Sequence, residues 1–164
     1  MTRTFSIRLL RLSDLDRILQ IEHASFGKDA YDRNLFADLT RKCGELFLVA
    51  AMSGRICGYM VTCVGEAHQS TPGKPASGRA ELVSIAVDPK HRGKGIASAL
   101  MDSTLRRLRR RGIVRFHLMV KVTNEVAIRL YEEYGFQKLR IVRGYYEDGT
   151  DGWRMAKCWN LRLK

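Results

Sequence analysis

Apolar residues recur along this chain at two spacings, and the change from one spacing to the other separates expected helices from expected strands. Spacings of three and four residues predict helices over residues 14–26, 32–43, 96–112 and 123–135. Continuous or alternating apolar stretches predict strands over residues 5–10, 45–52, 56–67, 79–87, 114–120, 136–146 and 153–161. The resulting order is β–α–α–β–β–β–α–β–α–β–β.

Short polar residues mark the expected helix boundaries. Ser13 and Asp32 stand where the first two helices begin, and either Thr123 or Asn124 opens the last one. Gly135 follows that last helix, in the position where glycine commonly ends a helix with a left-handed residue.

The element order predicts a single domain over residues 1–164 with an α/β (α+β) fold. Turn segments at residues 53–55 and 147–152 predict hairpins, so most neighbouring strands should be antiparallel. The expected architecture is a mixed, mainly antiparallel, twisted sheet of about seven strands flanked by about four helices. Residues 68–78 carry two of the three prolines and are expected to form a surface loop.

The net positive charge of the chain indicates an anionic partner but does not identify which one. The chain has 29 Lys and Arg residues against 17 Asp and Glu, a formal net charge of +12. Such a field attracts nucleic acid, acidic lipid or a phosphorylated cofactor, although a basic surface also serves solubility alone. No apolar run is long enough to span a membrane and no signal-peptide core precedes the first helix, so we expect a cytoplasmic location without membrane contact.

The cysteines and histidines do not indicate a metal site. Cys43, Cys57, Cys63 and Cys158 form no CxxC pair, and the four histidines show no HxxxH spacing. We therefore expect four reduced thiols and no bound metal.

The segment AELVSIAVDPKHRGKGIASALM, residues 80–101, combines a buried strand, a glycine-rich basic turn and a helix. A helix that begins near Gly95 leaves N–H groups unpaired at its positive end, which favours an anion. Gly93 and Gly95 would let a diphosphate approach the main chain, with Arg92 and Lys94 at the rim. The turn is neither a Walker A loop nor a Rossmann fingerprint, and glycine geometry alone is the alternative explanation.

Two segments together resemble a known family. RGKGIA fits the R/Q-x-x-G-x-G/A pattern, with Arg92, Gly95 and Ala97 in the defining positions. VTNEVAIRLYEEYGF is similar to the pattern N-x-x-A-x-x-x-Y-x-x-x-G-F. Both patterns are typical of the GNAT N-acetyltransferase superfamily, so residues 80–136 resemble its acetyl-coenzyme A loop and the following half of its fold.

This resemblance implies acetyl-CoA as the donor. The main chain of residues 85–87 would pair with the pantetheine arm, the amides of residues 92–97 would hold the pyrophosphate, and Asn124 would lie near the pantetheine. The implied cofactor-binding residues are Ile85, Ala86, Val87, Arg92, Gly93, Lys94, Gly95, Ile96, Ala97, Ser98 and Asn124.

The catalytic candidates are Glu81 and Tyr131. Acetyl transfer needs a deprotonated amine and a protonated thiolate leaving group. Tyr131 corresponds to the tyrosine that similar enzymes use as general acid, although a packed aromatic is the alternative. Glu81 opens an apolar strand, where a carboxylate is costly unless partnered, and AELVSIAV is similar to the histone-type GNAT strand whose glutamate is the base. A surface glutamate is the alternative.

One position departs from the RimI-like ribosomal-protein acetyltransferases, which the segment HLMVKVTN otherwise resembles. Met119 stands where that group has its catalytic glutamate, and a thioether cannot accept a proton. Either Glu81 or a water held by backbone carbonyls must then act as the base. His117 would lie on the same face as Met119, where it would assist or simply pack.

The acceptor is suggested by the C-terminal segment. IVRGYYEDGTDGWRM resembles the hairpin of protein N-terminal acetyltransferases that carries a Tyr-Tyr pair. Tyr145 and Tyr146 would hold the N-terminal residues of a peptide, with Phe26 and Tyr31 as the opposite wall. Packing at the sheet edge is the alternative for the two hairpin tyrosines.

The run RRLRRR, residues 106–111, is expected to form a solvated helix face, with contact to ribosomal RNA or an acidic partner as the alternative. The sequence thus predicts an acetyl-CoA-dependent acetyltransferase that acts on a protein N-terminal α-amine by direct attack. The alternatives are a small-amine acetyltransferase for polyamines or antibiotics, and a non-catalytic module that senses acetyl-CoA or associates with nucleic acid.

Overall fold

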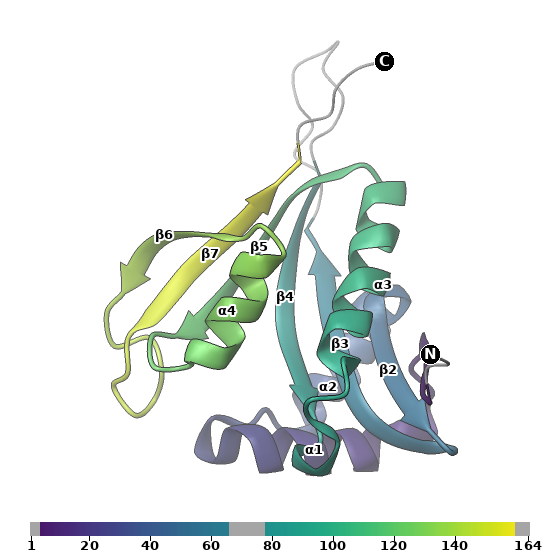
Figure 1. Cartoon of the computed structure of the whole chain (residues 1–164). Coiled ribbons are helices and arrows are strands. Elements are labelled where there is room, and N and C mark those ends of the chain that lie inside the picture. Colours follow the sequence, from purple (N-terminus) through teal and green to yellow (C-terminus); the bar gives the residue numbers. More distant parts are fainter. Residues whose placement is uncertain (1–3, 66–77, 160–164) are drawn as a thin grey trace. The chain divides into compact units, whose positions relative to one another are not determined.

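The computed structural model describes residues 4–65 and 78–159, and its elements follow the expected order. The helices are α1 (Leu15–Phe26), α2 (Arg33–Cys43), α3 (Ile96–Arg110) and α4 (Glu125–Glu133), drawn in Figure 1. The strands are β1 (Ser6–Leu9), β2 (Phe47–Met52), β3 (Arg55–Val64), β4 (Gly78–Val87), β5 (Ile113–Lys121), β6 (Gln137–Val142) and β7 (Gly152–Cys158). The expected surface loop lies outside the described residues, apart from its last residue, which opens β4.

The strands form a seven-stranded sheet in the order β1-β2-β3-β4-β5-β7-β6. The pair β4–β5 is parallel, whereas β1–β2, β2–β3, β5–β7 and β6–β7 are antiparallel. The predicted mixed, mainly antiparallel sheet with four α-helices is therefore confirmed, including the final hairpin of β6 and β7.

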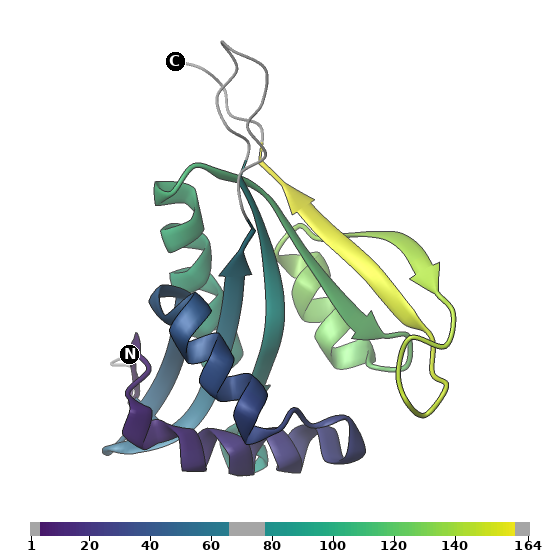
Figure 2. The same cartoon turned by 180° about the vertical axis from the view of Figure 1, so that it is seen from behind.

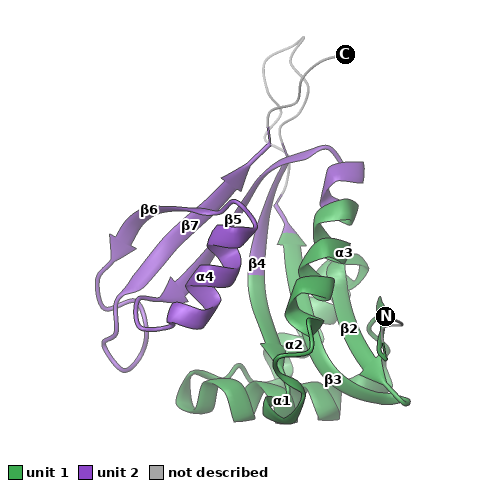
Figure 3. Ribbon diagram, in the orientation of Figure 1, with its two compact units in different colours: residues 1–63, 83–107 green, residues 64–82, 108–164 purple. Residues whose placement is uncertain are grey.

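The chain divides into two compact units, which Figure 3 shows in different colours. Unit 1 comprises residues 1–63 and 83–107, and unit 2 comprises residues 64–82 and 108–164. Strand β4 contributes its first half to unit 2 and its second half to unit 1. The expectation that the whole chain is one domain stays a prediction.

Unit 1 is built around aromatic side chains. Helices α1 and α2 cover one face of its strands and α3 covers the other, as Figures 1 and 2 show from opposite sides. Phe36 of α2 packs edge-on against Tyr59 of β3 at a centroid distance of 5.7 Å, and both are fully buried. Ile18 and Ile21 of α1 close the same core, so the apolar stripe of α1 faces inward as its spacing predicted.

Unit 2 has a core on one face of its strands. Phe116 and Leu118 of β5 and Met155 of β7 are fully buried. Helix α4 packs there, as does Phe136, three residues after the helix ends, with its ring centroid 5.3 Å from that of Phe116. The alternate residues of β5 point to the opposite face, and no helix from the described residues of unit 2 lies on that face (Figure 2).

Two of the expected caps are confirmed and one is wrong. Asp32 accepts a hydrogen bond from the Leu35 N–H at 2.9 Å, and Asn124 accepts one from the Ala127 N–H at 3.2 Å. Ser13 instead lies inside a short 3₁₀ turn before α1, where the Asp14 carboxylate accepts the Arg11 N–H at 2.8 Å. The helical backbone thus begins before Ser13, and the extended conformation of a cap residue falls on Arg11.

The expectation of four reduced thiols is wrong for two of them. Cys43, the last residue of α2, forms a disulfide with Cys63 of β3, with their Cα atoms 5.1 Å apart. Cys57 and Cys158 are free. The pair was invisible in the sequence because its members are 20 residues apart and meet only when α2 folds back over β3.

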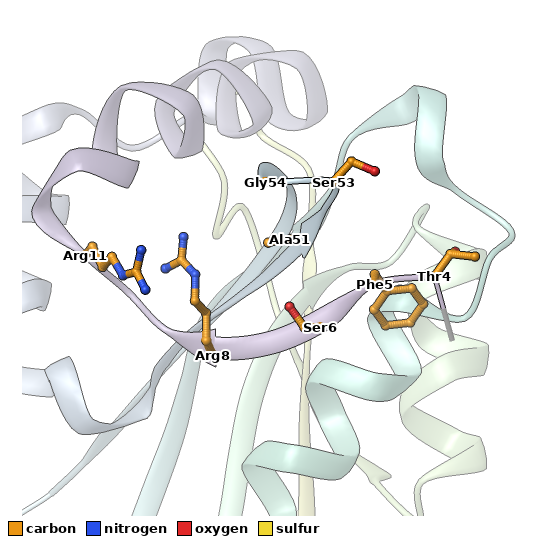
Figure 4. A pocket seen from close by; sticks show the side chains of 8 residues that line it. All are labelled: Thr4, Phe5, Ser6, Arg8, Arg11, Ala51, Ser53 and Gly54. Carbon is orange, nitrogen blue, oxygen red and sulfur yellow. The ribbon is translucent and has the colours of Figure 1, made fainter. Parts of the chain in front are cut away.

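Among the described residues, no helix has the length and apolarity that crossing a bilayer requires. A hollow of about 470 Å³ lies at the β1 edge of unit 1, and Figure 4 shows its lining residues, among them Arg8, Arg11 and Ser53. The Arg8 guanidinium is already paired with Asp14 at 2.7 Å, and none of the predicted site residues lines this hollow.

Candidate active site

The basic turn between β4 and α3 has the conformation that its glycines require. Gly93 and Gly95 both have φ of 79°, in the left-handed region that disfavours other residues. A Cβ at either position would meet no atom within 4 Å. Backbone geometry therefore demands the glycines, and the space beside them is open. Anion binding at this turn stays a prediction. Lys94 is exposed at this rim, and α3 begins two residues later, at Ile96.

Asp88 fastens this turn to the rest of unit 1. Its backbone N–H donates to the Cys57 carbonyl at 2.8 Å, and its carboxylate accepts the Lys90 N–H at 3.1 Å. The same carboxylate pairs with Arg17 of α1 and lies 3.4 Å from Nδ1 of His91. Burial opposes ionisation, but these donors outweigh it and hold the pKa of Asp88 below its usual value.

Arg92 has a structural role in the same turn. Its Nε donates to the Val87 carbonyl at 3.2 Å, and its terminal nitrogen donates to the Ser25 hydroxyl at 3.3 Å. The guanidinium thus ties the end of β4 to α1, while Lys94 makes no such contact within the described residues. Of the two rim cations, Lys94 is the better placed to meet an anion.

A buried carboxylate lies at the centre of unit 1. Glu22 of α1 is 1% exposed and accepts the Tyr31 N–H at 3.1 Å through one oxygen. Its other oxygen accepts the Ser84 hydroxyl at 3.2 Å and the Tyr59 hydroxyl. Burial raises the pKa of Glu22 to about 7, although the Tyr31 and Ser84 hydrogen bonds favour its charged form.

Two titratable groups meet in unit 2. Glu81 of β4 and His117 of β5 occupy paired positions, with the Glu81 carboxylate 3.8 Å from Nε2 of His117. Burial lowers the pKa of His117, and although Glu81 raises it, Arg154, Arg115 and Arg79 lower it further. His117 is therefore neutral near pH 7 and has a nitrogen lone pair available.

Tyr131 of α4 is 4% exposed and packs against Phe136 at a centroid distance of 5.8 Å. Burial raises the pKa of its hydroxyl, and Tyr146 raises it further. The phenol therefore keeps its proton across the physiological range, which suits a proton donor.

The two hairpin tyrosines gather around a glycine of β7. Tyr145 and Tyr146 stand edge to face at 5.0 Å, and Tyr145 is 51% exposed. A Cβ on Gly152 would lie 2.8 Å from the Met119 methyl and 3.4 Å from each tyrosine side chain. Met119 thus lies beside the tyrosine pair, and the absent Cβ leaves room for them.

The chain matches the Acetyltransferase (GNAT) family over residues 12–136. This chain belongs to that family. It is also 31% identical to an N-alpha-acetyltransferase of Saccharolobus solfataricus, over 94% of this chain and 93% of the relative.

Solved structures agree with this membership. Ard1 from Thermoplasma volcanium superposes with a TM-score of 0.85 at 28% identity, covering 94% of this chain and 97% of that one. The ribosomal-protein-S18-alanine N-acetyltransferase from Escherichia coli gives a TM-score of 0.77 at 27% identity, covering 98% and 99%.

The remaining predicted residues of this GNAT acetyltransferase lie as follows. In β4, exposure alternates as predicted, with Ser84 and Ala86 buried and Ile85 and Val87 partly exposed. Ile96 is buried at the start of α3, and Ala97 and Ser98 are partly buried beside it. Asn124 is exposed, and its carbonyl oxygen caps α4.

The predicted acceptor residues divide between the two units of this GNAT acetyltransferase. Phe26 packs against the core of unit 1, and Tyr31 is 39% exposed just before α2. Tyr145 and Tyr146 belong to unit 2. Whether the two pairs act as opposite walls stays a prediction.

Three residues that support the candidate site, Glu22, Asp88 and Arg17, were not predicted from the sequence. Glu22 lies on the apolar stripe of α1, where a carboxylate is costly to bury without hydrogen-bond partners. That position could have predicted the hydrogen bonds that Glu22 accepts from Tyr31 and Tyr59. Asp88 and Arg17 are 71 residues apart, and nothing in their local sequence announces the ion pair that supports the turn.

Proposed function

We propose that this chain transfers the acetyl group of acetyl-CoA to the α-amine of a protein or peptide N-terminus. Family membership and the likeness to an N-alpha-acetyltransferase over almost the whole chain support this assignment. The observation that carries it is that unit 2 contains a carboxylate–imidazole pair, a protonated buried phenol, and a tyrosine pair in which Tyr145 is exposed and Tyr146 partly buried.

The turn between β4 and α3 fits the phosphates of the donor. Two glycines of positive φ, open space beside them, the exposed Lys94 and the N-terminal end of α3 make an anion-binding main chain. Acetyl-CoA bound there would supply an acetyl thioester. The main chain of residues 85–87 would hold its pantetheine arm, as the family resemblance implies.

Glu81, helped by neutral His117, would take the proton that the amine loses as its nitrogen bonds to the acetyl carbon. Tyr131 would give its proton to the sulfur as the carbon–sulfur bond breaks, and solvent would restore it. Tyr145 and Tyr146 would hold the first residues of the acceptor. No covalent enzyme intermediate is required.

Mass spectrometry of three substrate pools tests this function. Purified protein and acetyl-CoA are incubated with free N-terminal peptides, with N-blocked lysine peptides, and with polyamines and aminoglycosides. We expect acetylated α-amines, lost in Glu81→Gln and Tyr131→Phe but kept in Glu133→Gln, whose glutamate is exposed on α4. Acetylation of small amines alone would overturn the peptide assignment and keep the enzyme class.

The non-catalytic alternative rests on Met119, which replaces the glutamate expected from RimI-like enzymes. Tight acetyl-CoA binding without turnover of any pool would support a sensor instead. A cytoplasmic location and proximity to the ribosome or RNA through the exposed Arg106, Arg109 and Arg110 of α3 also remain proposals.

A further inference from the structure

Arginines from every strand of unit 2 share one face of the sheet. Strand register pairs Arg79 of β4 with Arg115 of β5, and Arg140 of β6 with Arg154 of β7. Arg154 in turn pairs with Met119, two residues beyond His117 on β5. Because directly paired residues of a sheet point to the same side, all of these side chains lie on one face. We call Arg79, Arg115, Arg140 and Arg154 the arginine face.

The arginine face surrounds the proposed base, Glu81, and its neighbour His117. Glu81 pairs with His117 on the same face. Arg79 precedes Glu81 by two residues on β4, and Arg115 precedes His117 by two residues on β5. Arg154 of β7 pairs with Met119, which follows His117 by two residues. At about 3.3 Å per residue, the stretch from Arg115 to Met119 spans about 13 Å. An extended peptide of about four residues has the same length.

These positive charges are not balanced by neighbours. Within residues 4–65 and 78–159, none of the four guanidinium groups forms an ion pair, whereas Arg8, Arg17 and Lys121 each have a carboxylate partner. Arg79 and Arg140 are exposed, and Arg115 and Arg154 are partly exposed. Their field reaches the reacting groups, because Arg154, Arg115 and Arg79 each lower the pKa of His117.

The opposite face of these strands is occupied by the core of unit 2. Lys157 of β7 donates to the Tyr134 carbonyl at the end of α4 at 2.7 Å, and Phe116 and Met155 are fully buried. Figure 2 looks onto the face that α4 leaves uncovered. An acceptor peptide that lies along the uncovered face of these strands would therefore meet the arginines.

Resting on the proposed function, we propose that the arginine face selects acceptor peptides with acidic side chains among the few residues that follow the reacting α-amine. Charge complementarity supplies the attraction. An acidic peptide fits better than a nucleic-acid strand because Glu81 lies among the arginines and would repel a continuous row of phosphates. The adjoining tyrosine pair suits a peptide main chain as well.

Three peptides that differ only in residues 2–4 test this selectivity. Those residues are Glu, Gln or Lys, and kcat/KM is measured for each at about 0.05 M and about 0.5 M salt. We expect the Glu peptide to exceed the Gln peptide by about tenfold at low salt, as a few partly exposed ion pairs allow. The Lys peptide should be slowest, and salt should reduce the differences.

The double variant Arg140→Gln/Arg154→Gln should lose about tenfold on the Glu peptide and little on the Gln peptide. Arg106→Gln/Arg109→Gln is the matched control, since it removes the same charge from exposed positions on α3. Equal loss of acidic selectivity in both double variants would overturn the arginine face in favour of net charge.

The remaining outcomes separate the two proposals. Equal acetylation of the Glu and Gln peptides by the wild type would overturn the selectivity and leave the acetyltransferase function standing. If no peptide is acetylated, the proposed function itself fails. Fluorescence anisotropy of a labelled RNA hairpin tests whether the arginine face binds nucleic acid instead. The inference would also be overturned if the wild type bound RNA and showed no preference for acidic peptides, and if only Arg140→Gln/Arg154→Gln lost the RNA binding.

Discussion

Glu81 and His117 occupy paired positions on the parallel strands β4 and β5, with the carboxylate 3.8 Å from the imidazole Nε2. A carboxylate beside a neutral imidazole is an arrangement that can accept a proton and pass it to solvent. The pair stands in unit 2 together with Tyr131, which makes three proton-transferring groups available in one unit.

Removing the Glu81 carboxylate should lower the turnover number without changing the stability of the fold. We expect Glu81→Gln to lower kcat by about 10²–10⁴-fold, the usual contribution of a general base, because Gln cannot accept the proton. Glu81 is exposed, so the denaturation midpoint should stay within experimental error. Steady-state kinetics and urea unfolding of Glu81→Gln and Glu133→Gln measure both effects. Equal kcat in the two variants would rule out Glu81 as the base.

His117 should matter through its protonation. Burial and the nearby arginines lower its pKa, so it remains neutral at a pH where an ordinary histidine is already charged. The ratio of kcat/KM between wild type and His117→Gln, measured against pH, cancels the titration of the peptide amine. We expect this ratio to be constant near pH 7 and to fall only below about pH 6.5, the ordinary histidine pKa. A ratio of one at all pH values would assign His117 a packing role.

The buried phenol should act on the leaving group. Tyr131→Phe is expected to lower kcat by about 10²-fold or more while the dissociation constant of coenzyme A changes little, because only the proton donor is removed. Tyr134→Phe, on the same helix end, is the matched control. Calorimetric titration and single-turnover kinetics separate binding from chemistry, and a tenfold weaker Kd with unchanged kcat would contradict the assignment.

The support beneath the donor turn can be tested through Asp88. Asp88→Asn leaves Arg17 partly buried without its carboxylate, and we expect coenzyme A binding to weaken by about tenfold as the turn loses its anchor. Asp16→Asn is the control, since Asp16 pairs with Arg33 at an exposed position of the same helix α1. Calorimetric titration with coenzyme A compares the two, and equal affinities would show that the anchor is dispensable.

Glu22 should make stability depend on pH. Its pKa of about 7 lies above the 4.5 of an unperturbed glutamate, so the folded state holds a proton that the unfolded state releases. The stabilising contribution is complete below about pH 4.5 and is lost as pH rises through 7, a difference of about 3 kcal/mol. Glu22→Gln removes this dependence.

Denaturant unfolding at several pH values compares wild type, Glu22→Gln and the exposed control Glu133→Gln. We expect the free energy of unfolding of Glu22→Gln to gain on wild type as pH rises from 4.5 to 8, while Glu133→Gln follows the wild type. Parallel curves for all three would mean that Glu22 is ionised in the folded state throughout.

The disulfide should stabilise the fold by restricting the unfolded chain. Cys43 and Cys63 close a loop with a sequence separation of 20, for which chain-entropy arguments give about 3 kcal/mol. Cys43→Ala/Cys63→Ala, or reductant added to wild type, should lower the free energy of unfolding by that order. Cys158→Ala, which removes an exposed free thiol, should not. No change on reduction would contradict a contribution from this crosslink.

The glycine turn and two helix caps could be predicted from the sequence because each depends on residues that are close together in the chain. The turn at Gly93 and Gly95 needs left-handed backbone and a following helix, and both requirements are written within a few residues. Asp32 and Asn124 likewise cap helices through N–H groups three residues away. Ser13 does not cap α1 because the helical backbone begins earlier, in the 3₁₀ turn that follows Arg11.

Long-range pairing could not be predicted in the same way. The Cys43–Cys63 bond, the Arg17–Asp88 ion pair and the burial of Glu22 against Tyr59 all join elements that are distant in the chain. Their energies depend on which helix returns to which strand, and composition does not encode that geometry.

The sequence by itself determined the order of helices and strands and the glycine turn, because hydrophobic period and backbone preference act over a few residues. Glu81 and Tyr131 became candidates through the resemblance of their segments to GNAT enzymes. Only the tertiary structure decided which side chains meet: Glu81 with His117, Met119 with the tyrosine pair, and Arg79 with Arg115. Strand register sets those meetings, and a slip of one residue would send each side chain to the opposite face.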